Sequence, residues 1–498
     1  MVKDSLNSCI GCSVMNKVVI IGGGTAGYMA AAFFNNKGYD VTIIYDNNKK
    51  ERLVVGESLT ANTFYFLEQL CGFTRKDWML GSDAVFKNGI LYKNWAYDNE
   101  RFFNTWEHTE VTPFSYPTIG HSYYKWAKTR PYFNQLFDTN KTYFTDIDTI
   151  PSVKYFDSCL TQNASLDGAF GIQLDAVKLS NFIETRLKDS IKTLHHTITE
   201  VVYKEQDVIK LVLDDGSYID TTDTLIIDAS GFSKVIISTH PQFKEESLSD
   251  ITVPNRALLY PYEYDNKKDE MKPRTSVTRV SHGWIWNMPN AQRVGAGYVF
   301  NSNYSEDNEI ILDFCKSVNH KNVIVSDVVK HGTFINFPSK RTKDVWLGNI
   351  LSIGMSSGFI EPMEAPALLG VQFTLQYGIH YFKDATPANK KDVNNKVRDF
   401  VLSMCDFILL RYKTAGPNIN SKFWDYVNLK APTVGVDKFI KATSPIITHG
   451  SYGPCMPPLS HNNLICSVKF TDDLDKYTFI ESDTLTMYEY LERLQHAC

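Results

Sequence analysis

A short apolar run followed at once by glycines constrains the fold of this chain most. Residues 17–21, KVVII, predict a buried strand, and the GGGTAG that follows predicts a tight turn. Residues 25–36 are mostly small and apolar and predict a helix closed by Gly38, and residues 40–46 predict the next strand. A β-α-β unit of this kind is typical of Rossmann-type dinucleotide-binding domains. The sequence therefore predicts an α/β fold.

The glycines of this turn are spaced for a phosphate. Glycine lets the chain approach a pyrophosphate closely, and the following helix offers its free N–H groups. The alternative is a glycine-rich turn without a ligand, but the strand before it and the helix after it favour a dinucleotide. The candidate cofactor residues here are Gly22, Gly24, Thr25, Ala26 and Gly27.

An acidic residue at the end of the second strand would complete such a site by accepting hydrogen bonds from ribose hydroxyls. Tyr45 and Asp46 occupy this place, and Asp46 is the candidate ribose contact, although it stands one position late. No second glycine pattern lies between a strand and a helix. The chain is therefore expected to hold one dinucleotide, without a nicotinamide-binding fold of its own.

Composition excludes several classes of partner. The 498 residues carry a net charge of −5, so no basic excess favours nucleic acid. No apolar run reaches the ~18 residues of a membrane span, and residues 1–14 do not read as a signal peptide. Nine scattered cysteines, an odd number, favour free thiols in a reducing cytoplasm. Cys9 and Cys12 form a CxxC whose interpretation as a metal or redox pair is less favoured than chance, and no metal site is expected.

The domain organisation is expected to be interleaved. Residues 1–14 would be a flexible N-terminal extension, and residues 15–385 the cofactor-binding core. Substrate-facing segments would be inserted into this core at about 100–170 and 250–330. Residues 386–498 would form a C-terminal part of helices and loops that binds substrate.

Several further elements can be predicted from periodicity. Asp83 to Trp95 predicts a strand or a strand pair, and residues 198–213 and 224–228 predict strands. Residues 176–189 predict an amphipathic helix and residues 391–412 a long one.

Motifs along residues 16–420 carry a resemblance to a known family. They are GGGTAG at 22–27, VVGES at 54–58, FKNGI at 86–90, DASGF at 228–232, GWIWNMP at 283–289, RVGAGYV at 293–299 and GFIEPME at 358–364. The chain resembles the flavin-dependent halogenases, in the branch typified by tryptophan halogenases, and a phage-type branch is one interpretation. WxWxxP is the most specific element, because related flavin monooxygenases generally lack it.

The resemblance implies a fold and a reaction. The fold is an α/β (α+β composite) FAD-binding Rossmann-type domain with an interleaved substrate-binding region and a helical C-terminal part. In the family, reduced FAD (FADH2) reacts with O2 and gives a C4a-hydroperoxide. A halide ion attacks the distal oxygen of this hydroperoxide and gives hypohalous acid, which passes through a tunnel to an aromatic substrate. A separate flavin reductase is implied as the source of FADH2. Glu57 and Gly354 are implied as further cofactor contacts.

Two residues match the family's catalytic pair. Lys87, in FKNGI, would polarise hypohalous acid or capture its halogen as a haloamine, which requires a shielded amine. The alternative is a solvated lysine on a strand. Glu364, in EPMEA, would act as general base toward the cationic ring. Glu361 is the other carboxylate here, and Pro362 favours a loop around it, so Glu361 is interpreted as a structural hydrogen-bonding group.

The chain departs from the family just after Glu364. The family has Ser-Thr there, whose backbone N–H groups help hold the halide, whereas this chain has Ala365, Pro366 and Ala367. Proline has no N–H, so one halide donor is missing at Pro366 if Pro366 and Ala367 form the halide site. Chloride is small and strongly hydrated and depends most on such donors. The hypothesis is a preference for bromide or iodide.

Trp284 and Trp286 are two residues apart, so both side chains point to one face of a strand. In the family this element lies beside the tunnel, and two indoles there would wall the flavin off from the substrate. The alternative is ordinary core packing, and the two interpretations are compatible.

The substrate is expected to be an indole, a phenol or another electron-rich heteroaromatic, rather than free tryptophan in particular. One rival interpretation is a flavin-dependent aromatic hydroxylase, which would need neither Lys87 nor halide. Another is a flavin-binding protein without turnover. Self-association into a homo-oligomer is left open by the sequence.

Overall fold

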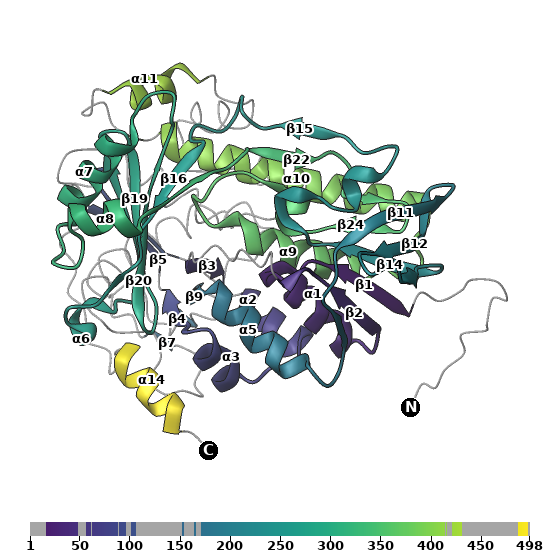
Figure 1. The fold of residues 1–498 in the computed structure, drawn as a ribbon. Helices are drawn as coiled ribbons and strands as arrows, with labels where there is room; N and C mark the ends of the chain where they lie inside the picture. Colours follow the sequence, from purple (N-terminus) through teal and green to yellow (C-terminus); the bar gives the residue numbers. More distant parts are fainter. Residues whose placement is uncertain are drawn as a thin grey trace.

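The protein was analysed as a computed structural model, which describes residues 16–47, 56–60, 62–87, 89–95, 101–105, 152–153, 164–165, 171–413, 415, 421–430 and 487–496. The predicted extension at 1–14 lies outside these residues, as does the CxxC within it. The described elements form two main sheets side by side, one at the left and one at the right of Figure 1.

The first sheet carries the predicted β-α-β unit. β1 (Lys17–Ile21) and α1 (Thr25–Asn36) have the predicted bounds, and β2 (Asp40–Ile44) ends two residues earlier than predicted. The other strands are β10 (Lys192–Leu194), β14 (Thr224–Asp228), β23 (Trp346–Leu347) and β24 (Ile350–Ser352). Their order is β10-β2-β1-β14-β24-β23, and all pairs are parallel except β23 with β24. The predicted Rossmann-type α/β fold is confirmed.

The second sheet is mixed, with the order β21-β16-β20-β19-β18-β5-β6 and β17 paired to β20. Its strands are β5 (Gly89–Lys93), β6 (Arg101–Thr105), β16 (Arg256–Leu259), β17 (Tyr262–Glu263), β18 (Thr275–Val280), β19 (Gly283–Pro289), β20 (Arg293–Phe300) and β21 (Thr333–Asn336). The tryptophan motif is therefore a central strand of this sheet.

The described residues also form smaller sheets. The first has the order β3-β9-β4, and the predicted strand pair in residues 83–95 is split, because β4 belongs to this sheet and β5 to the large one. The strands of the smaller sheets are β3 (Gly56–Thr60), β4 (Val85–Lys87), β9 (Gly171–Asp175), β11 (Ile198–Lys204), β12 (Asp207–Leu213), β13 (Tyr218–Asp220), β15 (Glu245–Ser247), β22 (Lys340–Thr342), β25 (Gly358–Phe359), β7 (Ser152–Val153) and β8 (Ala164–Ser165).

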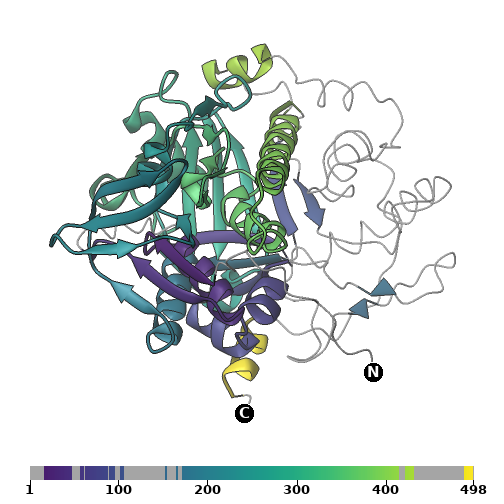
Figure 2. The same cartoon turned by 90° about the vertical axis from the view of Figure 1, so that its right-hand side faces the viewer.

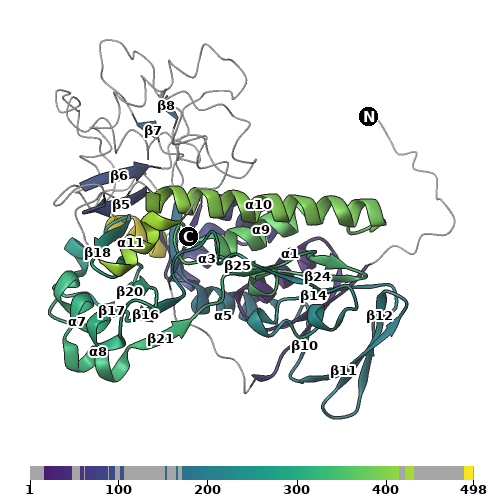
Figure 3. The ribbon, with the colours of Figure 1, turned by 90° about the horizontal axis from the view of Figure 1, so that it is seen from above.

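The helices cover the sheets. They are α1, α2 (Asn62–Phe64), α3 (Arg75–Gly81), α5 (Ala176–Leu187), α6 (Lys267–Glu270), α7 (Asp307–Val318), α8 (Val325–His331), α9 (Pro366–Gly378), α10 (Pro387–Lys413), α11 (Lys422–Leu429) and α14 (Met487–His496), with a π-helical stretch at Tyr65–Leu70. The long helix α10 lies side by side with α9, as the rotated views show (Figures 2 and 3). None of the helices in the described part of the chain has the length and apolarity to cross a membrane.

Local sequence explains where these helices begin. Asp175 caps α5 by accepting hydrogen bonds from the N–H groups of Val177 and Lys178. The helix α9 begins at Pro366. Proline suits the first position of a helix because its φ is already helical, and because the N–H that it lacks would have no hydrogen-bond acceptor within the helix.

Helix α10 links two hydrophobic cores. Its first half supplies Val393 and Val397 to the core around the Rossmann-type sheet and α1. Its second half supplies Phe400, Met404 and Tyr412 to the core between the large sheet and α11. One rigid element therefore connects the cofactor-binding sheet to the sheet that carries the tryptophan motif.

Candidate active site

The turn after β1 has the geometry of a phosphate cradle. Gly22 has φ +121°, and a Cβ there would lie 2.3 Å from the carbonyl oxygen of Ala229. A Cβ on Gly27 would lie 2.0 Å from the carbonyl oxygen of Gly22, whereas a Cβ on Gly24 would meet nothing within 4 Å. Gly22 and Gly27 thus serve close packing, while Gly24 leaves its backbone open. Gly24, the N-cap residue of α1, has no side chain that could bond the N–H groups of the first turn, so these groups can bind a pyrophosphate, and the residues fit FAD.

A distant glycine reaches this cradle. Gly354 has φ +60°, and a Cβ there would lie 2.9 Å from the Cβ of Ala26 on α1. Thr25, next to it, donates its hydroxyl to the carbonyl oxygen of Ala176 at 2.9 Å. The structure therefore brings Gly354 together with the predicted cofactor residues of the first turn.

The end of β2 is arranged differently from the expectation. The Tyr45 hydroxyl donates to Glu184 Oε1 at 2.6 Å, and Asp46 Oδ2 accepts from the hydroxyl of Thr197 at 3.3 Å. The ribose role of Asp46 stays a prediction, and Glu184 on α5 is an acid that the sequence analysis missed. Glu57 lies on β3, and its side chain is outside the described part.

Lys87 is the last residue of β4, at the junction between the small and the large sheet. It is only 2% exposed, and its Nζ donates to the hydroxyl of Ser58 on β3 at 2.5 Å. Burial lowers the pKa of Lys87 to about 8, the charge of Glu364 opposes this shift, and Arg411 adds to it. The interpretation of Lys87 as a solvated lysine is therefore wrong. Near pH 8 much of this amine is neutral and nucleophilic.

Glu364 lies in a strained loop directly before α9. Glu364 and Ala365 have φ values of 61° and 48°, a left-handed pair without glycine. Because the helix begins only at Pro366, both glutamates of the motif are in the loop, and the loop that Pro362 predicted around Glu361 is confirmed. Glu364 lies near enough to Lys87 for its charge to raise the pKa of the lysine, against the effect of burial.

Two buried donors hold the Glu364 carboxylate by one oxygen. The hydroxyl of Tyr92 on β5 donates to Oε1 at 2.6 Å, and Nε of Arg411 on α10 donates to the same atom at 2.7 Å. The side chains of Arg411 and Glu364 are 0% and 3% exposed. The ion pair is therefore buried, where its charges are weakly screened.

Glu361 is linked to the tryptophan motif. The indole Nε1 of Trp284 donates to the Tyr412 hydroxyl at 2.8 Å, and this hydroxyl donates to Glu361 Oε1 at 2.7 Å. Burial raises the pKa of Glu361 to about 8, although Tyr412 and the backbone N–H of Val253 favour the charged form. At neutral pH Glu361 is therefore mostly an uncharged carboxylic acid, which agrees with its interpretation as a structural hydrogen-bonding group.

The two tryptophans point to one face of β19, as predicted. Their ring centroids are 6.0 Å apart, and both belong to the core between the large sheet and α10, whereas Ile285 packs on the opposite face. Ile360 and Met363 of the glutamate loop belong to the same core. Core packing is thus present, and the role of the indoles as a wall of the tunnel stays a prediction.

A small hollow, partly open to solvent, lies at the start of α9. Gly354, Ser357, Pro366 and Ala367 are among its lining residues. The N-cap residue Ala365 makes no side-chain cap to this helix, so Ala367 can offer its N–H there, while Pro366 has none. The predicted halide residues and one predicted cofactor residue therefore share one cavity.

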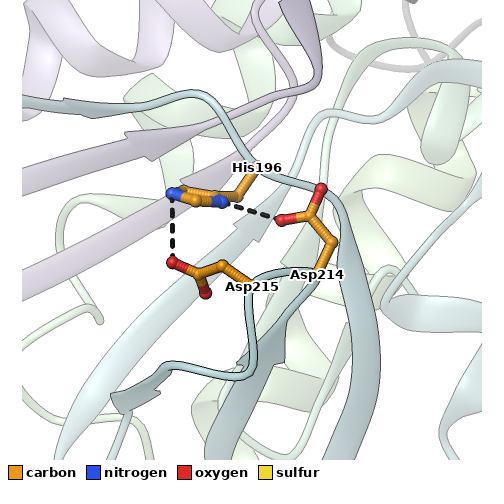
Figure 4. A group of neighbouring side chains, drawn as sticks. All are labelled: His196, Asp214 and Asp215. Carbon is orange, nitrogen blue, oxygen red and sulfur yellow. Dashed lines mark hydrogen bonds and ion pairs between the residues drawn. The ribbon is translucent and has the colours of Figure 1, made fainter.

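A group of three polar side chains lies elsewhere. His196 Nδ1 is 2.7 Å from Asp214 Oδ1 and its Nε2 is 3.8 Å from Asp215 Oδ2 (Figure 4). Such a group could in principle bind a cation, yet both imidazole nitrogens already face carboxylates, and the aspartates are exposed. These contacts link the start of β11 to the turn after β12. This part of the molecule lies far from β5 (Figure 3).

The sequence analysis missed several residues of this site, namely Ser58, Tyr92 as a donor, Arg411 and Tyr412. A signal existed for one of them. Arg411 follows the apolar run FILL inside a predicted helix, which is unusual for a solvated arginine.

Fold and site together define a class: an FAD-binding Rossmann-type protein with a buried lysine and glutamate beside a tryptophan-containing strand. Comparisons with known proteins agree. Tryptophan 7-halogenase RebH of Lentzea aerocolonigenes is 25% identical over 430 residues, which cover 82% of this chain and 78% of that protein. 7-Chloro-L-tryptophan 6-halogenase KtzR of Kutzneria sp. is 23% identical over 442 residues, covering 82% and 81%.

Solved structures share the fold. Tryptophan 6-halogenase SttH of Streptomyces toxytricini superimposes with a TM-score of 0.78 at 21% identity, covering 90% of each chain. Tar14, a tryptophan C-6 flavin-dependent halogenase (chlorinase) from taromycin biosynthesis, has a TM-score of 0.77 at 18% identity, covering 97% and 96%. The family profile described as tryptophan halogenase matches residues 17–444. The chain belongs to the tryptophan halogenase family and is a flavin-dependent halogenase.

Proposed function

We propose that the protein halogenates a small electron-rich aromatic substrate, an indole, a phenol or another heteroaromatic, using FADH2, O2 and halide. The observation that carries this proposal is the pairing of a buried, partly neutral Lys87 amine with the Glu364 carboxylate. A hydroxylase would need neither group, and a protein that only bound flavin would not need a lysine kept out of water.

The cofactor is FAD. Bound in its reduced form, it supplies the reaction with O2 that oxidises halide to hypohalous acid. Gly22, Gly24 and Gly27 would hold the pyrophosphate together with the free N–H groups of α1. Gly354, packed on α1 and lining the hollow by α9, would face the flavin end. A separate flavin reductase would supply FADH2.

Lys87 and Glu364 divide the remaining chemistry. The Lys87 ammonium would donate a hydrogen bond to hypohalous acid, or its neutral amine would take the halogen and release water. As the aromatic carbon forms the carbon–halogen bond, the oxygen–halogen bond of hypohalous acid breaks and the oxygen leaves as water with a proton from the Lys87 ammonium. From the haloamine, the nitrogen–halogen bond breaks instead, and the electron pair returns to the Lys87 nitrogen, which takes up a proton. Glu364 accepts the proton from that carbon, and the electron pair of the broken C–H bond restores the aromatic ring.

The halide is proposed to be bromide or iodide in preference to chloride. The motivation is Pro366 at the first position of α9, which removes one N–H donor from the hollow. Losing a donor costs most for the anion that is hardest to dehydrate. Since Tar14 is described as a chlorinase, the preference would be a property of this chain and not of the whole family.

The first experiment is a competition assay. The protein, FAD, a generic flavin reductase, NADH and air are incubated with equal chloride, bromide and iodide and a panel of indoles and phenols. Halogenated products by mass spectrometry that disappear in Lys87→Ala support the proposal, and their mass identifies the halide. Hydroxylated products without halogen contradict it, and a clear excess of chlorinated product contradicts the halide preference alone.

A further inference from the structure

Two consecutive residues near the end of α10 hold the two glutamates of the active-site loop. Arg411 donates to Glu364 and Tyr412 donates to Glu361. We propose that Arg411 is a positioning residue of the halogenation site, which fixes Glu364 in a buried ion pair and withholds part of its charge from Lys87. The inference rests on the roles proposed above for Lys87 and Glu364.

The geometry of the carboxylate supports this role. Tyr92 and Arg411 both donate to Oε1, and among the described residues no hydrogen bond reaches Oε2. One oxygen is therefore used to orient the group and the other is left to accept a proton. Because Tyr92 and Arg411 already orient the Glu364 carboxylate, this group does not need to pair with Lys87 for its orientation.

Arg411 is itself fixed in place. Its guanidinium carbon lies 4.8 Å from the ring centroid of Tyr92 and 4.8 Å from that of Phe407. Its carbonyl oxygen accepts the indole N–H of Trp95 at 2.9 Å. Because the side chain is fully buried and stacked between two rings, it cannot swing away from Glu364 without leaving a charge unpaired.

Charge balance connects Arg411 to Lys87. Among the described residues, Glu364 and Arg411 are the charged groups that act on the lysine. Tyr92, the other donor to Glu364, is neutral because burial raises its pKa well above the usual value. One carboxylate is thus shared by two cations. Since Arg411 always carries its charge, the lysine is the cation that loses its proton.

The experiment is a titration of Lys87 by NMR of protein carrying 13C-labelled lysine, with Lys87→Met to assign the signal. It compares the wild type with Arg411→Met and with Arg411→Lys, which keeps a cation. Arg398→Met on the same helix is the matched control, because within the described part of the chain the ion pair of Arg398 is with the half-exposed Asp399. Circular dichroism checks that each variant is folded.

We expect the wild-type Lys87 to titrate near pH 8. In Arg411→Met the midpoint should rise by about one pH unit or more, since a repelling cation is lost and Glu364 can pair with the lysine. Arg411→Lys should stay close to the wild type and Arg398→Met should match it. If Arg411→Met does not fold, Arg411→Gln replaces it with the same expected shift.

Two results would overturn the inference: an unchanged Lys87 midpoint in a folded variant without Arg411, or a wild-type Lys87 that titrates as an ordinary lysine. The pH profile of halogenation gives a parallel readout. In Arg411→Met, kcat should fall by a larger factor than KM changes, and the midpoint of the kcat profile should move with the Lys87 midpoint. Failure of the proposed function is a different result, because product formation would then survive in Lys87→Ala whatever the titration shows.

Discussion

The buried Glu361 makes a quantitative prediction about stability. Its pKa is raised from 4.5 to about 8 by burial, so between these two values the unfolded chain carries a carboxylate and the folded protein a carboxylic acid. Folding then takes up one proton, and the free energy of unfolding falls as the pH rises. The slope is about 1.4 kcal/mol per pH unit, and over roughly 3.5 units the loss approaches ~5 kcal/mol.

Glu361→Gln removes this titration and keeps an oxygen that can accept from Tyr412. The variant should therefore gain stability relative to the wild type as the pH rises from 5 to 8, with a gain near pH 8 of about 3–5 kcal/mol after about 1 kcal/mol is subtracted for the new amide donor. Below pH 5 the difference should be small or slightly unfavourable.

The assay is urea unfolding followed by tryptophan fluorescence at several pH values, with FAD at constant excess. Taking the difference between wild type and variant cancels every other group that titrates in both proteins. Glu200→Gln on the exposed face of β11 controls for the substitution itself. A difference between the wild type and Glu361→Gln that stays flat from pH 5 to 8 would refute the argument that Glu361 is protonated in its buried site.

Other variants test separate parts of the site. Gly27→Ala should unfold or strongly destabilise the protein, because its Cβ would lie 2.0 Å from a carbonyl oxygen, while Gly24→Ala should fold normally and weaken FAD binding, as measured by thermal stability and flavin fluorescence. Trp284→Phe, which deprives the Tyr412 hydroxyl of its donor, should cost about 1–3 kcal/mol of unfolding free energy, and an unchanged value would argue against this hydrogen bond. Lys87→Met should abolish halogenation and leave FAD binding unchanged, so residual product above background would contradict its role.

The parts of the fold that could be predicted depend on neighbours in the sequence. The bounds of β1 and α1 follow from an apolar run, three spaced glycines and a stretch of small residues. The start of α9 follows from Pro366, since the conformational restriction of proline is local. Lys87 and Glu364 could be named only because their motifs resemble a family, and the structure adds that Lys87 is buried.

Other features depend on contacts that no local pattern contains. Asp46 stays the predicted ribose contact, but no local pattern indicates that Tyr45, directly after β2, donates to Glu184 on a distant helix. The strand pair expected in residues 83–95 divides between two sheets, because pairing with β9 and β18 outweighs the continuity of the pattern.

Arg411 shows why the electrostatics of the site had to come from the structure. The arginine stands on a helix whose sequence indicates only amphipathicity, and its partner Glu364 is 47 positions earlier in the chain. Lys87 comes from the N-terminal part of the chain, at the end of β4 and two residues before β5 of the large sheet. The charge of Lys87 thus depends on three segments that are far apart in the sequence and that packing around α10 brings together. A change in the packing of α10 should therefore alter the reactivity of Lys87 without changing either Lys87 or Glu364.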